Sequence, residues 1–495
     1  MARNPKRLGV GATVIVTLVI LAMIAATGFV VWLCIDLVNQ EPDNPTLNNT
    51  PVDLPTVSTE TEPTEEVTVP PTTEPPVPEH VVATATISTQ GDLLMHSPVF
   101  ATAKQSDGSY DFENIFRYSK DLVSSVDYAI ANLETTFGGP KHPHQPNMAF
   151  SCPDELAANA VTAGYDMFLT CNNHTGDAMG DGLIRTLEVA REAGLATLGS
   201  QMPGEKRYSV VEINGIKIGM VAYTWAFKGD GSSFSLNGLS AIKDEGQMNY
   251  FTKANPDKLY KEAEQIMADM KADGAEATMI QIHWGEEYTT VENALQNKIA
   301  QKLCDIGFDV IVGGHPHVVQ PMELLTSSED PEHKTVCIYS LGNAVSNQRA
   351  GISDKFPSAG YTEDGVFFTT TFEKYSDGTV YLAGVDVIPT WVNMHSNDGK
   401  KEYNILPLDK EQEGQWKELF RLTDHNLSSC LKSYDRTMGI VGEGLAECQE
   451  WLAARKEARE QYYHDLAFFP ERFEAAEPVV EETEAIAQET LPNAA

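Results

Sequence analysis

Seven polar side chains that could support metal or acid–base chemistry occur at the ends of short apolar runs. In chain order they are Asp92, Glu134, Asn173, His174, His283, His315 and His317. Carboxylate, imidazole and amide oxygen together suit a borderline divalent cation such as Mn, Fe or Zn. If the apolar runs are strands of an α/β fold, these residues sit at the carboxyl ends, where such sheets bind ligands. The pattern therefore predicts a site for one or two divalent metal ions.

Each of these residues also has a purely structural interpretation. Asp92 follows Gly91, a pair that is common in turns, and His315 and His317 flank Pro316, which could form a rigid turn. Packing alone, however, does not require ligand-type residues at so many strand ends. Metal binding is therefore the favoured interpretation.

The elements that must position these residues are apolar runs bounded by polar or glycine-rich turns, typical of strands buried on both faces. The predicted strands are residues 81–88, 126–134, 165–174, 216–224, 277–285, 308–317 and 335–343. Helical patterns lie between several of them, at 154–164, 181–194 and 293–307. Strand–helix alternation indicates an α/β domain. Two later segments, 365–373 and 380–392, look like hairpin strands, so we expect a mixed system of two packed sheets with outer helices.

The N-terminal residues are predicted to form a transmembrane signal anchor. Leu8 to Ile35 contains no charged residue, which exceeds the ~20 apolar residues that a spanning helix needs. Lys and Arg precede this stretch and acidic residues follow it, which predicts a single-pass protein of the cell membrane with a cytoplasmic N-terminus and an extracellular main domain. A cleaved signal peptide is the alternative, but its apolar core would be only ~7–15 residues.

Composition divides the chain into six segments. They are a cytoplasmic N-terminus (1–7), the anchor (8–38), a Pro/Thr/Glu-rich stalk (39–80), the main domain (81–406), a helical extension (407–472) and an acidic tail (473–495). The helical extension could cap the domain or serve as an interaction module. The tail is predicted to be disordered.

The net charge of −36 argues against a general nucleic-acid binder, which needs a basic footprint. An anionic substrate must then be attracted by metal ions or by a small basic loop. Lys141, His142 and His144 form such a loop, which is either a substrate site or an ordinary proline-rich surface loop. The seven cysteines contain no CxxC pair, and Cys430 with Cys448 is one candidate disulfide.

Six motifs occur in an order that resembles the CapA family of bacterial capsule-synthesis, poly-γ-glutamate-associated proteins. They are GDLLMH (91–96), NLE (132–134), NNHTGDAMGDG (172–182), HWGEEY (283–288), GGHPHVVQ (313–320) and YSLGN (339–343). The resemblance covers nearly all of residues 84–392. It implies a metallophosphatase-like fold, a two-sheet β-sandwich flanked by helices.

The resemblance also implies roles for single residues. The implied metal ligands are Asp92, Glu134 as the bridging carboxylate, Asn173, His283, His315 and His317. His174 is implied to protonate the leaving group, with the orientation of a metal ligand as the alternative role. Asp177 is expected to shape the loop, and Asn343 is a candidate for substrate binding.

One departure from the related metallophosphatases concerns the first strand, where they carry Asp-x-His. Leu94 occupies the histidine position here, and His96 is the nearest imidazole. His96 is a further candidate ligand if the strand continues that far, because residues two apart face the same side. If the chain turns earlier, one metal position lacks a ligand.

The function implied by the resemblance is a divalent-metal-dependent hydrolase or transferase acting outside the cell on an anionic capsule polymer such as poly-γ-glutamate. It would serve synthesis, export or anchoring, with capsule-synthase membrane subunits as partners. Two alternatives remain open: a non-catalytic polymer-binding component of a membrane capsule machine, and a general extracellular metallophosphoesterase.

Overall fold

The computed structural model describes residues 77–143, 149–229, 234–237, 240–242, 247–397, 399–469 and 472. The predicted anchor, most of the predicted stalk and the acidic tail lie outside these residues. Within the described part of the chain, no helix combines the length and the apolar character needed to cross a membrane.

The larger sheet has eight strands, in the order β18-β17-β16-β1-β2-β3-β4, with β15 paired to β1. Strands β1 to β4 run parallel, and β16 to β18 form an antiparallel meander beside β1. Their bounds are β1 Val81–Leu93, β2 Tyr128–Asn132, β3 Met167–Leu169, β4 Ala196–Leu198, β15 Asn343–Val345, β16 Asp364–Tyr375, β17 Val380–Asn397 and β18 Lys400–Pro407.

The second sheet has seven strands, in the order β10-β6-β11-β12-β14-β13, with β5 paired to β6. Strands β10, β6, β11, β12 and β14 are parallel. The bounds are β5 Ser209–Ile213, β6 Ile216–Ala226, β10 Tyr250–Thr252, β11 Ala277–His283, β12 Val310–Gly314, β13 Val319–Thr326 and β14 Lys334–Leu341. A small third sheet contains β7 Lys228–Gly229, β8 Phe234–Leu236 and β9 Ser240–Ile242.

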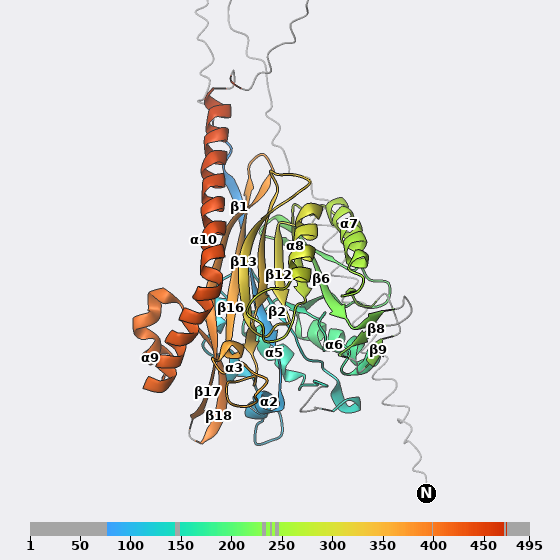
Figure 1. Cartoon of the computed structure of the whole chain (residues 1–495), viewed down its shortest axis with the longest axis vertical. Helices are drawn as coiled ribbons and strands as arrows, with labels where there is room; N and C mark the ends of the chain where they lie inside the picture. Colours follow the sequence, from blue (N-terminus) through green and yellow to red (C-terminus); the bar gives the residue numbers. More distant parts are fainter. Residues whose placement is uncertain are drawn as a thin grey trace, which may run out of the picture. The chain divides into compact units, whose positions relative to one another are not determined.

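Helices cover the outer faces of both sheets (Figure 1). The α-helices are α2 Ser97–Ala103, α3 Glu113–Phe116, α4 Lys120–Val123, α5 Glu155–Thr162, α6 Met179–Ala193, α7 Asp257–Ala272, α8 Ala294–Ile306, α9 Trp416–Leu419 and α10 Asp424–Phe468. Short 3-10 turns occur at η1 Gly139–Lys141, η2 Tyr361–Glu363 and η3 Lys410–Gln415. This arrangement confirms the predicted mixed α/β fold of two sheets and flanking helices.

Strand β11 shows why apolar runs predict such strands. All seven of its residues are buried. Met279 packs into the core between the two sheets, whereas Ile280 and Ile282 pack into the core under α7 and α8. Because successive side chains of a strand point to opposite faces, a strand with helices on one face and a sheet on the other is buried along its whole length and is therefore mostly apolar.

The C-terminal helix α10 is part of the fold. Its buried residues recur at spacings of three, four or seven positions, which puts them on one face, and Val441, Leu445 and Leu452 belong to the core between the sheets. The helix contacts β17 of the first sheet and β13 of the second. Of the two roles left open for the segment from residue 407, the structure supports the cap on the domain.

The candidate disulfide between Cys430 and Cys448 is wrong. Both cysteines lie on α10 and both are free. At a rise of ~1.5 Å per residue they are about 27 Å apart along the helix, far beyond the reach of a disulfide.

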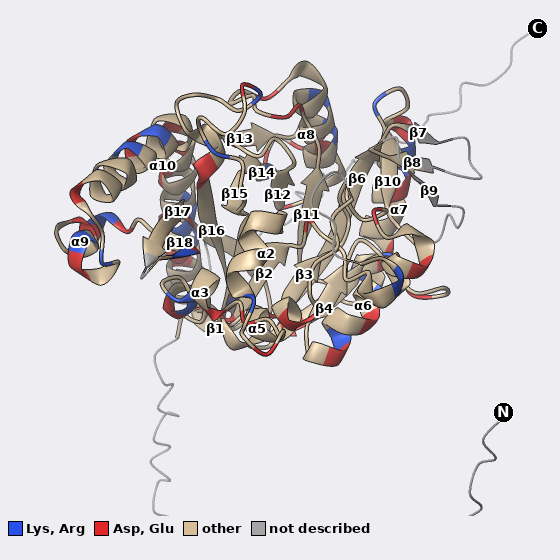
Figure 2. Cartoon of the chain, turned by 90° about the horizontal axis from the view of Figure 1, so that it is seen from below, with Lys and Arg blue, Asp and Glu red and all other residues tan. Residues whose placement is uncertain are grey.

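Charged side chains lie mainly on the outer elements of the domain. In Figure 2 they mark helices such as α6, α7 and α10, whereas the strands between them are mostly uncharged. Carboxylates inside the fold are therefore exceptions that need partners.

Candidate metal centre

The candidate ligands gather where the parallel strands of both sheets end. Asp92 lies at the end of β1, and Glu134 follows β2 by two residues. His283 is the last residue of β11, and His315 directly follows β12. Strands from two different sheets thus deliver side chains to one place.

These side chains form two groups that could each hold a metal ion. One group is Asp92, Glu134 and His317, and the other is Glu134, His283 and His315. Within each group the potential ligand atoms lie within 4.8 Å of one another, and every member is buried. We call them the first and second metal positions; Glu134 belongs to both, as a bridging carboxylate must.

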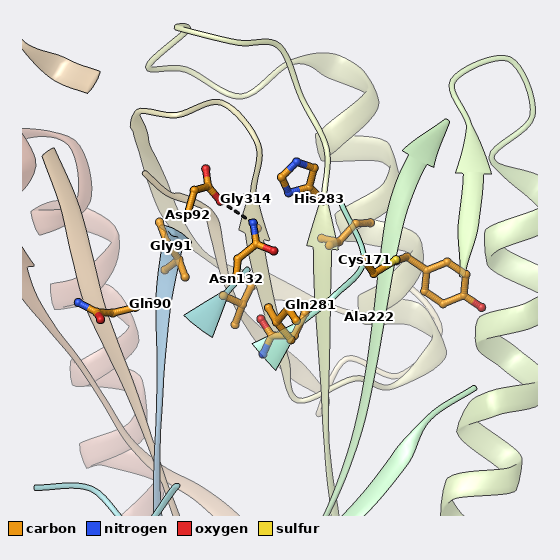
Figure 3. Close-up of a pocket in the computed structure, with 15 residues that line it drawn as sticks. Gln90, Gly91, Asp92, Asn132, Cys171, Ala222, Gln281, His283 and Gly314 are labelled. Atoms are coloured by element: carbon orange, nitrogen blue, oxygen red, sulfur yellow. Dashed lines mark hydrogen bonds between the residues drawn. The ribbon is translucent and has the colours of Figure 1, made fainter. Parts of the chain in front are cut away.

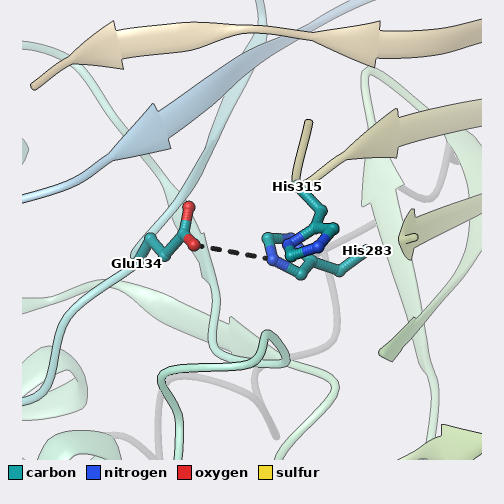
Figure 4. Close-up of side chains that lie close together, drawn as sticks. All are labelled: Glu134, His283 and His315. Carbon is teal, nitrogen blue, oxygen red and sulfur yellow. Dashed lines mark ion pairs between the residues drawn. The ribbon is translucent and has the colours of Figure 1, made fainter. Parts of the chain in front are cut away.

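Three of the donor atoms are buried without a hydrogen-bond partner among the described residues, as expected for atoms that bind a cation. Both carboxylate oxygens of Glu134 and Nδ1 of His315 are buried and have no hydrogen-bond partner among the described residues. A buried carboxylate without partners is costly unless it is paired or binds a metal. Figure 4 shows Glu134 facing the rings of His283 and His315, and His283 Nε2 is 3.6 Å from Glu134 Oε1.

A fourth donor completes the second position. Asn173, which follows β3, places its Oδ1 2.7 Å from Nε2 of His283. Its amide nitrogen donates to Oδ1 of Asn237 at 3.0 Å, which fixes the oxygen toward His283. The second position therefore has four candidate protein ligands.

At the first position, hydrogen bonds from neighbouring residues hold the candidate ligand Asp92 in place. Oδ2 of Asp92 lies 3.0 Å from Nδ1 of His317, and Oδ1 of Asp92 accepts from Asn132 at 2.7 Å. Asn132 is in turn held by Asn172, whose amide nitrogen donates to its Oδ1 at 3.1 Å. Such outer contacts orient metal ligands. Asn132 and Asn172 are part of the quoted motifs, but their roles depend on long-range packing.

Asn343 supports the first position as well. Its Oδ1 lies 3.2 Å from Nδ1 of His317, and its amide nitrogen donates to the backbone oxygens of His317 and Thr362. The side chain is fully buried. Its expected role in substrate binding remains a prediction, and its contacts here orient His317.

Backbone geometry at the histidine pair is unusual. His315 and His317 have φ angles of 98° and 57°, in the left-handed region that side chains other than glycine rarely adopt. Such conformations cost ~1–3 kcal/mol each and occur at functional sites where the surroundings enforce them. The strain places both rings at the edge of β12.

Gly91 explains the glycine before Asp92. A Cβ at this position would lie 1.9 Å from the backbone oxygen of Gly342. Because only glycine permits this approach, the backbone N–H of Asp92 can donate to that oxygen at 3.1 Å. The GD pair thus anchors Asp92 against the neighbouring segment.

Burial keeps two of the imidazoles neutral. It lowers the pKa of His283 to about 3, and together with the charges of His283, His317 and Lys253 it lowers the pKa of His315 well below its usual range. Burial also opposes protonation of His317, but the hydrogen bond and charge of Asp92 raise its pKa overall. Neutral imidazole is the form that binds metal, so the second position presents ready ligands.

His174 lies beside the centre with a carboxylate behind it. Its Nδ1 is 2.7 Å from Oδ2 of Asp177, and its Nε2 is 3.9 Å from Oε1 of Glu134. Asp177 also accepts the backbone N–H of Phe150 at 2.6 Å, which fixes the carboxylate. The sequence indicated only a loop-shaping role for Asp177; the structure shows that it orients His174.

His96 lies outside both donor groups. Strand β1 ends at Leu93, and His96 immediately precedes α2, so the chain turns before His96 could follow Asp92 on the same strand face. Its Nδ1 accepts the backbone N–H of Asn347 at 3.3 Å, and its ring contacts Phe150. Burial chiefly lowers the pKa of His96 to about 4. The first position therefore has three candidate ligands.

Lys141 and His142 bind the same acidic residue. Lys141 Nζ and His142 Nε2 lie 2.5 and 3.0 Å from the carboxylate of Asp181 at the start of α6. His144 is outside the described residues. Substrate binding by this loop remains a prediction. The sequence did not single out Lys253, whose charge lowers the pKa of His315 and whose ammonium lies over the ring of Trp225, a neighbour of His315.

Beneath the centre lies a small cavity between the two sheets (Figure 3). Its volume is about 20 Å³, and Asp92, Asn132, Gln281 and His283 contribute to its wall. This is room for little more than one water molecule. A substrate must therefore approach from the outer side of the strand ends.

The family described as bacterial capsule synthesis protein PGA_cap matches residues 86–348. The chain belongs to this family. The match spans all the residues of both metal positions and confirms the resemblance drawn from the six motifs.

Two curated relatives are CapA proteins. The chain is 28% identical over 334 residues to the "Capsule biosynthesis protein CapA" of Bacillus anthracis, covering 66% of this chain and 71% of the relative. It is 24% identical over 338 residues to the "PGA biosynthesis protein CapA" of Bacillus subtilis strain 168, covering 66% and 78%.

Among solved structures, the chain is similar to the NAD nucleotidase NadN of Haemophilus influenzae. The similarity covers 77% of this chain and 68% of that chain, with 13% identity and a TM-score of 0.38. A likeness of this size says nothing about the substrate.

Proposed function

We propose that this protein is a divalent-metal-dependent hydrolase or transferase that acts on an anionic capsule polymer, poly-γ-glutamate, at the outer face of the cell membrane. The observation that carries the proposal is the carboxylate of Glu134. It is fully buried, has no hydrogen-bond partner among the described residues, and is shared by two groups of metal-type donors. The CapA relatives support capsule biosynthesis as the setting.

Metal ions held at these positions would polarise the attacked carbonyl or phosphoryl group and lower the pKa of a bound water. Asp92, Glu134 and His317 would hold the first ion. Glu134, Asn173, His283 and His315 would hold the second. The metal identity stays among Mn, Fe and Zn, because imidazole, amide and carboxylate donors suit all three.

The protein's own proton donor is His174. Asp177 holds Nδ1 of this ring, which leaves Nε2 directed to the side of Glu134. A proton on Nε2 could pass to the leaving group, and Asp177 would stabilise the imidazolium before transfer. The amide nitrogen of Asn237 lies beside the ring, 3.3 Å from Nδ1 and 3.4 Å from Nε2.

Residues 8–38 would anchor the protein in the membrane with the catalytic domain outside the cell. The uncharged stretch from Leu8 to Ile35 and the basic residues before it support this placement. Capsule-synthase membrane subunits would be the natural partners of an anchored enzyme.

The test is metal-dependent turnover by the full-length chain. The purified protein, stripped of metal and reloaded with Mn²⁺, Fe²⁺ or Zn²⁺, is incubated with poly-γ-glutamate, and the polymer length and any new end groups are measured. We expect a change that requires metal.

The variant H174A should lower the rate of this reaction by ~10²–10⁴-fold while metal content is unchanged. D177N should have a smaller effect in the same direction, because the ring stays but loses its orientation. A polymer that binds but never changes would support the non-catalytic alternative. Robust turnover of simple phosphate esters without action on the polymer would support the phosphoesterase alternative.

A further inference from the structure

A second cavity adjoins the metal centre on the side of His315. Its volume is about 340 Å³, within the ~300–1,000 Å³ typical of small-molecule sites. We call it the aromatic pocket. Its wall is formed by Trp225, Phe251, Lys253, Trp284, Gly285, Glu286, Asn293, Ala294, Leu295, Gln296 and Ile299.

The aromatic pocket shares a wall with the metal centre. Trp225, near the end of β6, has its ring centroid 5.5 Å from that of His315. Trp284 directly follows the candidate ligand His283 at the end of β11. A substrate group in this pocket would therefore be continuous with a group at the second metal position.

The wall combines apolar surface with one cation. The accessible apolar surface comes mainly from Ala294, which is exposed, and Leu295, which is half-buried, in front of the buried rings of Trp225, Phe251 and Trp284. Lys253 Nζ lies 4.4 Å from the ring centroid of Trp225. Lys253 also binds Glu286 at 2.7 Å, with side-chain exposures of 38% and 62%. An ion pair this exposed is weak, so Lys253 can share its charge with an incoming anion.

The other polar groups of the pocket differ in whether they already have a hydrogen-bond partner. Asn293 accepts the backbone N–H groups of Leu295 and Gln296 at the start of α8, so these donors are satisfied. By contrast, Nε1 of Trp225 is buried with no hydrogen-bond partner among the described residues. Because that N–H is itself buried, the pocket offers one ammonium group, that of Lys253, beside apolar walls.

We propose that the aromatic pocket binds one glutamyl-like unit of the substrate, an aliphatic chain that carries a carboxylate and an amide. The carboxylate pairs with Lys253, and the methylene groups pack on the accessible parts of Ala294 and Leu295. This deepens the proposed function, on which it rests, because it names the part of the polymer that is recognised beside the metals.

The experiment is a calorimetric titration of the full-length chain, solubilised in detergent, with a γ-linked glutamate trimer. K253M should weaken binding by about two- to fivefold, the size expected for a charge pair at a partly exposed site. The metal content of each variant is measured in parallel.

The matched control is K206M. Lys206 is likewise bound by a carboxylate, that of Asp273, and lies over an aromatic ring, that of Tyr208 at 5.4 Å, but it does not line this pocket. K206M should bind the trimer as the wild type does.

Unchanged affinity in K253M, or no binding of the trimer by the wild type, would overturn the proposal. Tighter binding of an aromatic, uncharged ligand than of the trimer would also overturn it. Trimer binding that depends on Lys253 in a protein without metal-dependent turnover would support the pocket and refute the proposed catalysis. Turnover of the polymer with the same KM in K253M would refute the pocket alone.

Discussion

The two metal positions share Glu134 but differ in how they are built. At the second position, His283 and His315 are buried imidazoles of lowered pKa, and Nδ1 of His315 has no partner among the described residues. At the first position, Asp92 and His317 already satisfy each other through a hydrogen bond of 3.0 Å. The second position also has four candidate ligands against three, because Asn173 joins it and His96 does not join the first.

This difference shows that the ligands of the second position need a cation to satisfy them, whereas Asp92 and His317 of the first position can satisfy each other without one. Without metal, the second position keeps unpartnered buried polar atoms, which are costly. At the first position, Asp92 and His317 form an ion pair when no metal is bound. We therefore expect the second position to bind its ion more tightly.

The largest effect should come from Glu134, which both positions share. In the wild type, Mn²⁺ should raise the free energy of unfolding by about 4 kcal/mol when the metal is at a thousand times its Kd. E134Q should abolish this stabilisation. Without metal, E134Q should be more stable than the wild type, because it removes a buried carboxylate that has no hydrogen-bond partner among the described residues. Thermal unfolding with and without Mn²⁺ measures both.

The control for this substitution is D364N. Asp364 is also a buried carboxylate, but Arg436 and Ser433 bind it. D364N should destabilise the protein with or without metal and keep the Mn²⁺ response. An E134Q protein that still responds to Mn²⁺ would remove Glu134 from the centre.

The next largest effect is on metal content, which should differ between variants of the first and of the second position. H317Q should keep about one equivalent of metal after gel filtration in metal-free buffer, because the four donors of the second position remain. H315Q should keep much less, since only the three-ligand position is intact. Elemental analysis by mass spectrometry gives the ratio, and the reverse order would contradict the comparison.

A smaller effect is expected from the outer contacts of the first position. N132A removes the hydrogen bond to Asp92, and N343A removes the contacts that orient His317. Each should weaken metal binding at the first position by ~10–100-fold. The second position should keep its affinity, as measured by competition with a metal-sensitive dye. Equal weakening at both positions would show that these residues act through general stability.

Much of the fold could be predicted from the sequence, and so could most of the side chains that the candidate metal centre brings together. The apolar runs predicted the strands because two-sided burial requires them, and Asp92, Glu134 and His315 stood out because they end such runs. The roles of Asn132 and Asp177 could not be predicted in this way. Each depends on where a distant chain segment packs, which local spacing does not record.

Lys253 and the aromatic pocket show the same limit. Lys253 follows the three-residue strand β10, and its neighbours in space, Trp225 and Glu286, lie 28 and 33 residues away in sequence. The histidine in the first-strand motif illustrates the opposite case. The spacing of His96 from Asp92 suggested a further metal ligand. Strand β1 ends at Leu93, however, and the His96 ring bonds to the backbone N–H of Asn347 instead.

The most direct test of the central claim is anomalous diffraction from crystals of the protein grown with Mn²⁺. We predict a strong anomalous peak between Glu134, His283 and His315, with a second, weaker peak between Glu134, Asp92 and His317. A structure without anomalous density at Glu134, at saturating Mn²⁺, would contradict the metal centre and the chemistry proposed for it.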